Sequence, residues 1–288
     1  MMPIEISKKE KILILAKTYP SPSAKYGETT CVAGITELGE MRRIYPVPFR
    51  MFESDKWFKK WQWVEAETYI NTEDKRKESR KIFYDKINPL NTIATDKKWK
   101  ERKGWLTAVP KITAFLPGKY VTPAVEDGVT LAVFAPDLPV KLEIKKARKT
   151  AWDDDELVKL RKVEEMCSNV LFPEDAPSQK IKILEKIPYD FYYRTTVKTT
   201  DNREKEIRIK LTDWEVCACY RNCLKDYRDG WQEKFRERIE ADMNTKDLRI
   251  LMGNQHRFEH EWLGISLIYP PKQTPYEAAQ SLLFDVDS

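Results

Sequence analysis

The sequence predicts an α+β protein: a small β-barrel or sheet comes first, and a C-terminal α+β region with one long helix and flanking hairpins follows. Three observations support this prediction. The compact apolar run at residues 12–16 is typical of a buried strand. Residues 30–36 and 41–47 flank a glycine-containing turn, which is the pattern of a β-hairpin. A capping pattern at Thr212 opens a long helical segment.

Further strands are expected in the first half of the chain. Residues 61–70 alternate between apolar and polar side chains, as a half-buried strand does. Residues 95–102 form a charged helical turn. Residues 129–134 and 140–144 are strand candidates on either side of a proline-containing turn. We therefore expect residues 1–150 to form a β-rich region of the OB or SH3 barrel type.

The second half begins with a helix and a hairpin. Acidic residues favour a helix start at residue 153, and this helix runs to about Cys167. Residues 189–199 and 206–211 alternate as two paired strands.

The long helix follows this hairpin. Thr212 is the expected N-cap, with Glu215 three residues later completing a capping box. The helix reaches Met243 and contains a candidate break at Gly230. Two more strands complete an α+β region over residues 151–271, and residues 272–288 form a flexible tail.

Composition bounds the class of protein. The net charge of +5 arises from 51 basic and 46 acidic residues, which permits a polyanionic partner without requiring one. The five cysteines are odd in number, which does not suit a secreted disulfide framework. No stretch approaches the roughly 20 apolar residues that a membrane-spanning helix needs. We expect a cytoplasmic protein with no membrane partner.

The tail contains Gln280-Ser281-Leu282-Leu283-Phe284. This segment resembles the pentapeptide by which many bacterial replication and repair proteins bind the sliding clamp. The resemblance implies that Leu283 and Phe284 fill a hydrophobic pocket, while the Gln280 amide anchors the other end. The alternative is that these apolar side chains dock back onto the domain as a terminal helix.

Basic residues interleaved with aromatic residues form the second functional signal. Nucleic-acid-binding proteins place Lys and Arg along phosphates and aromatic rings under unstacked bases. Further basic clusters occupy residues 75–81 and 141–149, and the alternative is a solvated face, because acidic residues interrupt these runs. The residues expected to contact DNA or RNA are Lys17, Arg42, Arg43, Arg50, Lys97, Lys98, Trp99, Lys100, Arg102, Lys103 and Trp105.

A zinc site is a weaker possibility. Cys217, Cys219 and Cys223, together with His256 and His260, could supply ligands in principle. Their spacing argues against it, because residues two apart on a helix do not face each other. We expect structural thiols and no metal site.

A catalytic site is the remaining alternative. Asp213 and Glu215 at the helix start, with His256 and Arg257, are the candidate catalytic residues of a metal-dependent nuclease that would use Mg²⁺. Acidic residues at a helix start also serve as caps, so capping is the competing interpretation. No other cofactor is expected.

Several segments resemble those of uncharacterised bacterial proteins. They are Lys17–Pro20, Arg43–Arg50, Asp213–Glu215, Gly253–Arg257 and Tyr269–Lys272. The opening hairpin is also similar to OB-type domains in proteins associated with mobile elements and defence. The resemblance implies an OB-like opening but no particular activity.

Together these signals predict a nucleic-acid-binding accessory protein in DNA replication, repair or defence. Its tail would tether it to the sliding clamp. The alternatives are a metal-dependent nuclease and a non-catalytic structural or sensing module.

Overall fold

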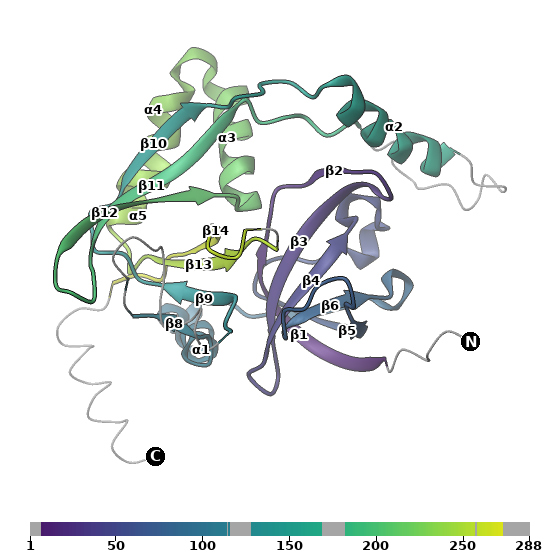
Figure 1. The fold of residues 1–288 in the computed structure, drawn as a ribbon, viewed down its shortest axis with the longest axis horizontal. Coiled ribbons are helices and arrows are strands. Elements are labelled where there is room, and N and C mark those ends of the chain that lie inside the picture. The colour runs from purple at the N-terminus through teal and green to yellow at the C-terminus, as the bar shows by residue number, and fades with distance from the viewer. Residues whose placement is uncertain (1–6, 114, 116–127, 169–181, 257, 273–288) are drawn as a thin grey trace.

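A computed structural model describes residues 7–113, 115, 128–168, 182–256 and 258–272 (Figure 1). These residues form two seven-stranded sheets and a nearly continuous helical segment, so the predicted α+β class is confirmed. Of the tail expected over residues 272–288, only Lys272 lies within the described residues.

The first sheet closes into a barrel of five strands. They follow the order β1-β3-β4-β6-β5, and β5 pairs again with β1. Gly34 allows close approach, because a Cβ there would lie 2.5 Å from the Leu13 carbonyl oxygen. The barrel strands are β1 (Lys8–Lys17), β3 (Gly27–Thr36), β4 (Met41–Val47), β5 (Gln62–Ile70) and β6 (Ser79–Ile82), and β2 (Ser21–Ser23) and β7 (Asn88–Thr92) extend the sheet.

The apolar run in β1 has a structural reason. Residues 12–16 are each at most 1% exposed, so this strand is buried on both faces. Ile12 and Ile14 point into the barrel core. Leu13 and Leu15 point the other way, into a cluster shared with the second sheet. A continuous apolar run, rather than an alternating one, is the consequence.

The second sheet follows the order β10-β11-β12-β14-β13-β9-β8. Sheet membership changes between β7 and β8, whereas the sequence places the boundary at residue 150. Strands β8 to β10 lie before that boundary but pair with one another or with C-terminal strands. The strands are β8 (Lys111–Ile112), β9 (Leu131–Phe134), β10 (Lys141–Lys146), β11 (Tyr189–Lys198), β12 (Glu204–Leu211), β13 (Arg249–Asn254) and β14 (Trp262–Ile268).

Helices follow β7, β10 and β12 along the chain. The predicted long helix is present as a nearly continuous run over residues 214–244, with a 3₁₀ turn at Gly230. The helices are α1 (Asp96–Thr107), α2 (Asp154–Ser168), α3 (Trp214–Tyr227), α4 (Trp231–Arg236) and α5 (Asp242–Asn244). Short turns are η1 (Phe49–Met51), η2 (Ser54–Lys56), η3 (Tyr84–Lys86), η5 (Arg228–Gly230) and the π-helical η6 (Glu237–Ala241).

The N-cap of α3 differs from the predicted one. Asp213, not Thr212, caps the helix, because its carboxylate accepts a hydrogen bond from the Glu215 amide at 2.7 Å. The Thr212 amide instead donates to the Gly264 carbonyl at 2.8 Å and extends the sheet contact. The start of the helix was therefore predicted one residue too early.

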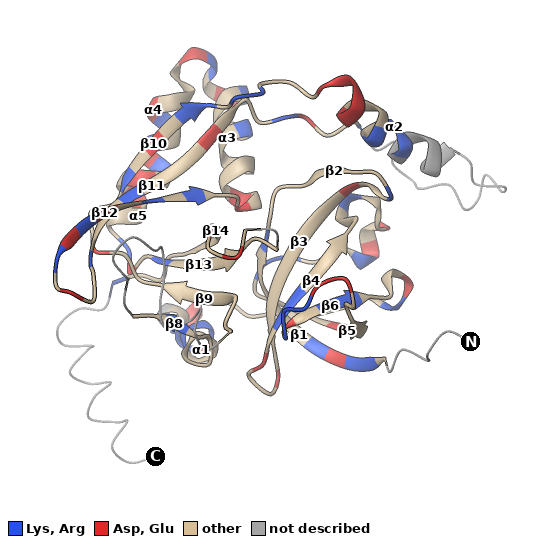
Figure 2. Cartoon of the chain, viewed as in Figure 1, with Lys and Arg blue, Asp and Glu red and all other residues tan. Residues whose placement is uncertain are grey.

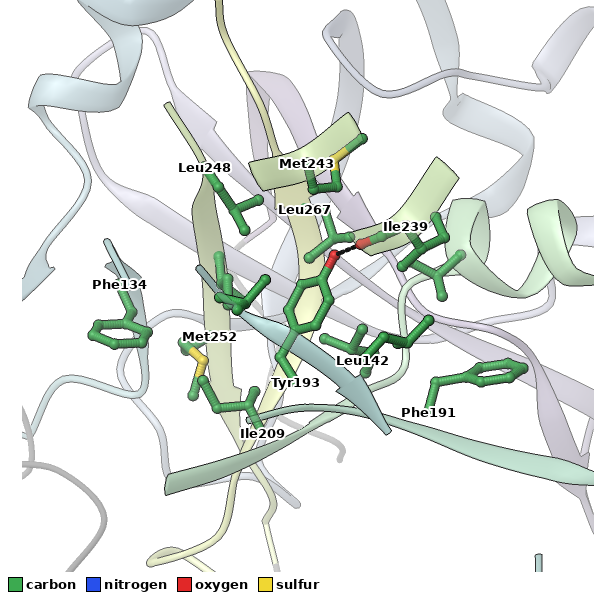
Figure 3. Packing of buried hydrophobic residues seen from close by; sticks show 14 of the residues in the cluster. Phe134, Leu142, Phe191, Tyr193, Ile209, Ile239, Met243, Leu248, Met252 and Leu267 are labelled. Atoms are coloured by element: carbon green, nitrogen blue, oxygen red, sulfur yellow. Dashed lines mark hydrogen bonds between the residues drawn. The ribbon is translucent and has the colours of Figure 1, made fainter. Parts of the chain in front are cut away.

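Helices α3 to α5 pack on one face of the second sheet. Tyr193 stands at the centre of this core and is fully buried (Figure 3). Its hydroxyl donates to the Ile239 carbonyl, which satisfies the polar end of the ring inside the core. Phe191 packs against Phe235 of α4, with the ring centroids 4.7 Å apart.

The barrel and the second sheet share a hydrophobic core. Leu13 and Ile35 of the barrel belong to the same buried cluster as Leu251 and Ile265 of the second sheet. Complete burial of such a side chain stabilises the fold by about 1.5–3 kcal/mol. We call this contact between the two sheets the seam. Within the described ranges, none of the helices combines the length and the apolar character of a membrane-spanning helix.

Candidate functional site

The Asp-Trp-Glu segment lies at one end of the seam. The Asp213 carboxylate is buried, and its two oxygens accept hydrogen bonds from the Glu215 and Leu267 amides, each at 2.7 Å. Burial raises the pKa of Asp213 to about 6, against the opposing influence of Lys60. Asp213 therefore fixes the start of α3 to β14.

Two barrel lysines complete this end of the seam. The Lys60 ammonium lies 3.1 Å from the Glu215 carboxylate and donates to the Leu267 carbonyl at 2.5 Å. Lys17 donates to the Phe58 carbonyl at 2.7 Å, and its ammonium lies 3.9 Å from the centre of a neighbouring phenyl ring. Burial lowers the pKa of Lys17 to about 8. Lys17 was expected to contact phosphate, but its ammonium is engaged inside the protein.

The other candidate catalytic residues lie elsewhere or outside the described residues. His256 Nε2 lies 3.9 Å from an Asp74 carboxylate oxygen, while Asp213 and Glu215 contact Leu267 and Lys60. Arg257 lies outside the described residues. No cluster of three or more His, Cys, Asp or Glu side chains suited to a metal ion occurs within the part of the chain that the structure describes.

The three cysteines of α3 face different surroundings. Cys217 and Cys223 are buried, whereas Cys219 is half-buried. Burial raises the pKa of the Cys217 thiol, so the thiol stays protonated at neutral pH. A protonated, buried thiol is typical of a structural position.

The hairpin arginines are engaged inside the protein. Arg42 is 6% exposed and donates to Glu10 at 2.7 Å and to Glu40 at 2.5 Å. Arg43 is 4% exposed and donates to the Thr130 carbonyl at 2.7 Å. The phosphate contacts expected of these two residues are not available, because their guanidinium groups already have protein partners.

Arg50 is paired in the same way. Its Nε donates to the buried Glu28 carboxylate at 2.8 Å, and a second nitrogen donates to the Lys182 carbonyl at 2.5 Å. Arg50 thus connects the barrel to the segment that returns from α2.

The aromatic residues of α1 pack on the seam. Trp99 and Trp105 make edge-on contacts with Trp61 and Trp63, at centroid distances of 5.8 and 4.9 Å. Arg102 donates to the Ile93 carbonyl at 2.6 Å. These three residues are therefore structural, although the sequence favoured a role in binding.

The lysines of α1 have a mixed environment. Lys97 and Lys100 are exposed, Lys103 is partly exposed, and the side chain of Lys98 lies outside the described parts. The cavity of about 880 Å³ beside α1 is lined by Lys97 and Lys100 but also by Glu37, Asp96 and Glu101. This balance of charge does not favour a polyanion.

A second cavity, of about 610 Å³, lies where the chain leaves the second sheet for α2 and returns to β11. Helix α2 itself lies over β2 and β3 of the barrel (Figure 1). We call this cavity the neck groove. Its lining contains four cations, four aromatic rings and one carboxylate, supplied by Arg148, Lys149, Lys186 and Lys210, by Tyr19, Trp152, Tyr189 and Phe191, and by Asp190.

Hydrogen bonds fix the walls of the neck groove. The Ala147 amide donates to the Pro188 carbonyl at 3.0 Å, which joins the outgoing and returning segments. The Trp152 indole N–H donates to the Leu184 carbonyl at 2.6 Å, and the Tyr19 hydroxyl donates to the Glu185 carbonyl at 2.7 Å. The groove is therefore lined by Tyr19, which follows β1, by strands of the second sheet and by the two segments that connect α2 to β10 and β11.

The cations of the neck groove are incompletely neutralised. Three of the four have an acidic partner, and these pairs are Lys210–Asp190 at 2.7 Å, Lys149–Asp153 at 2.5 Å and Lys186–Glu156 at 3.7 Å. Arg148 is exposed and makes no hydrogen bond or ion pair with any residue that the structure describes. Figure 2 shows Lys and Arg side by side on the chain between β10 and α2.

Only part of this groove has a local signal in the sequence. The basic run at residues 141–149 contains Arg148 and Lys149, and Trp152 follows three residues later. Lys186 and Lys210 carried no signal, because they are distant in sequence and join the groove only through the pairing of β10, β11 and β12.

Two family models match the chain. One, Domain of unknown function (DUF8758), matches residues 8–108, and the other, Domain of unknown function (DUF8757), matches residues 122–288, more than half of the chain. The chain belongs to the DUF8757 family. The DUF8757 match contains the whole lining of the neck groove except Tyr19, whereas the DUF8758 match covers the barrel and α1. No curated protein and no solved structure matches the chain significantly.

Proposed function

We propose that this protein binds nucleic acid through the neck groove. The observation that supports the proposal is the lining itself, in which several aromatic rings lie beside four cations and one of these, Arg148, has no acidic partner among the described residues. Cations attract phosphates and release counterions on binding, while aromatic rings stack on bases. The exposed Arg148 guanidinium is the strongest candidate for a phosphate contact.

The groove is also of suitable size. Its volume of about 610 Å³ falls within the range of roughly 300–1,000 Å³ that is common for ligand pockets. The walls come from Tyr19, from β11 and β12, and from the two segments that connect α2 to the second sheet. Hydrogen bonds hold Trp152 and Tyr19 in place without a ligand. A prearranged site loses less conformational entropy when it binds.

Binding near DNA would be strengthened by the tail. The clamp-like segment with Gln280, Leu283 and Phe284 lies outside the described residues, so its role rests on the sequence. A tether to the sliding clamp raises the effective concentration of the groove at DNA without new groove contacts. We place this accessory protein in the cytoplasm, in DNA replication, repair or defence.

The binding role is favoured over the nuclease alternative by the surroundings of Asp213. Asp213 is buried and both of its oxygens accept backbone hydrogen bonds, while Glu215 pairs with Lys60, so these two carboxylates have structural partners in the fold. Incubation of plasmid and single-stranded DNA with Mg²⁺ or Mn²⁺ tests this choice, and metal-dependent degradation that is lost in Asp213→Asn would support the nuclease.

The proposal is tested by charge removal in the groove. We expect the double variant Arg148→Gln/Lys186→Gln to bind a fluorescent oligonucleotide at least tenfold more weakly at low salt. The slope of log K against log salt should fall by about 0.7 to 0.9 for each phosphate that the variant protein no longer neutralises. The matched control is Lys97→Gln/Lys100→Gln, which removes two exposed lysines of α1. Equal losses of affinity in both double variants would contradict the role of the groove.

The tether has a separate test. A pull-down with a bacterial sliding clamp should capture the full chain but not a version that ends at Lys272. Phe284→Ala should also lose the clamp while keeping the thermal stability of the parent. Capture of all three proteins to the same extent would refute the tether and leave groove binding unaffected.

A further inference from the structure

We infer that the neck groove selects single-stranded nucleic acid over duplex. This inference rests on the proposed function and specifies its substrate class. It is argued from the different exposure of two cations, Arg148 and Lys149, and of the aromatic rings that line the groove.

Two of the cations lie at the rim, and the rings lie deeper. Arg148 and Lys149 are exposed, whereas Trp152, Tyr189 and Tyr19 are partly buried. A phosphate can therefore reach the rim from solvent, but a base must enter the groove to contact a ring.

Trp152 is held ready for stacking. Its indole N–H is fixed by the Leu184 carbonyl, and the Lys186 ammonium lies 3.8 Å from the centre of its ring. This cation occupies one face of the ring through a cation–π contact, so a base would stack on the opposite face.

A duplex cannot use these rings without being opened. Its bases are stacked inside and its phosphates lie outside, so it can reach only the cations at the rim. A paired base must be unpaired and unstacked before it can enter a recessed pocket, whereas an unpaired base avoids most of this cost. The groove should therefore discriminate by strand state rather than by sequence, because every base has a face that can stack.

The experiment measures binding of the full chain to about ten nucleotides of single-stranded DNA, single-stranded RNA and the corresponding DNA duplex. We expect the better of the two single strands to bind at least tenfold more tightly than the duplex. Comparison of single-stranded DNA with single-stranded RNA shows which of the two the groove prefers. Equal affinity for single strand and duplex would overturn the inference while leaving the proposed function intact. Absence of binding to all three would overturn the proposed function itself.

Variants of Trp152 test whether its ring is the one that stacks on the base. Trp152→Ala should lose about tenfold in affinity for the single strand while leaving the weaker duplex affinity unchanged. Trp152→Phe keeps a ring but not the N–H, so we expect a smaller loss of affinity for the single strand than in Trp152→Ala. This variant also serves as the test if Trp152→Ala does not fold. Phe258→Ala is the control, because this ring is 59% exposed and lies outside the groove lining. If Trp152→Ala lost the same affinity for the single strand and for the duplex, the role of Trp152 in stacking on an unpaired base would be contradicted.

Discussion

The barrel arginines and the neck-groove cations carry the same charge in opposite surroundings. Arg42 and Arg43 are at most 6% exposed and lie among protein acceptors, whereas Arg148 is exposed at the rim of the neck groove and has no acidic partner among the described residues. A buried ion pair contributes to the fold and is unavailable to a ligand. The comparison teaches that the position of a cation in the fold, more than its local sequence, decides whether it can bind phosphate.

The largest expected effect comes from breaking the barrel network. Arg42→Ala leaves the Glu10 carboxylate, whose side chain is 4% exposed, without its main partner. We expect the free energy of unfolding to fall by about 3–5 kcal/mol, because an uncompensated buried charge is costly. Urea unfolding followed by tryptophan fluorescence measures this change.

Lys11→Ala provides the matched control for Arg42→Ala. Lys11 pairs with Glu37 at 3.3 Å, but both side chains are about half exposed, so the loss should stay below about 1 kcal/mol. Similar losses in the two variants would show that burial does not distinguish the barrel arginines.

A smaller effect is expected at the end of the seam. Asp213→Asn can keep one amide acceptor contact, but its NH₂ group cannot accept a hydrogen bond from the second amide, at Leu267 or Glu215. One buried donor is left unsatisfied, which should lower stability by about 1–3 kcal/mol. Unchanged stability relative to Asp229→Asn, at an exposed position, would contradict the role of Asp213 in docking α3 onto β14.

The two buried carboxyl groups should respond to pH with opposite signs. Hydrogen bonds and charge attraction from Arg42 overcome burial and lower the pKa of Glu10 from 4.5 to about 2. Its stabilisation is therefore fully present above pH 4.5 and is lost as the pH falls toward 2. Burial raises the pKa of Asp213 from 3.8 to about 6, so its protonated form favours folding below pH 3.8 and this contribution is lost as the pH rises through 6.

Urea midpoints measured between pH 2 and pH 7 separate these contributions. Glu10→Gln should flatten the change in stability between pH 2 and 4.5, and Asp213→Asn should flatten the change between pH 4 and 6. If the urea midpoint of Glu10→Gln varied with pH in parallel with that of the parent protein, Glu10 would have the same pKa in the folded and unfolded states.

The smallest effect on stability is expected in the neck groove. Arg148→Gln removes an exposed guanidinium without a partner among the described residues, so the free energy of unfolding should change by no more than about 0.5 kcal/mol. The same variant should weaken oligonucleotide binding. A stability loss comparable to that of Arg42→Ala would remove the distinction between the two regions.

Local sequence patterns were sufficient to predict several of the strands and the long helix. The apolar run of β1, the hairpin of β3 and β4 and the helix broken near Gly230 all follow from local patterns of burial and turn chemistry, and the structure contains each of them. Such patterns are predictable because the period of side-chain burial is a property of a single helix or strand.

The roles of the charged residues depend on contacts between segments that are distant in the sequence. Arg43 donates to the carbonyl of Thr130, 87 positions away, and Lys60 meets Glu215, 155 positions away. The neck groove likewise needs Arg148, Lys186 and Lys210 to be brought together by the pairing of β10, β11 and β12. The partner of a charged side chain depends on which distant segment packs against it, and local sequence patterns do not show which segment that is.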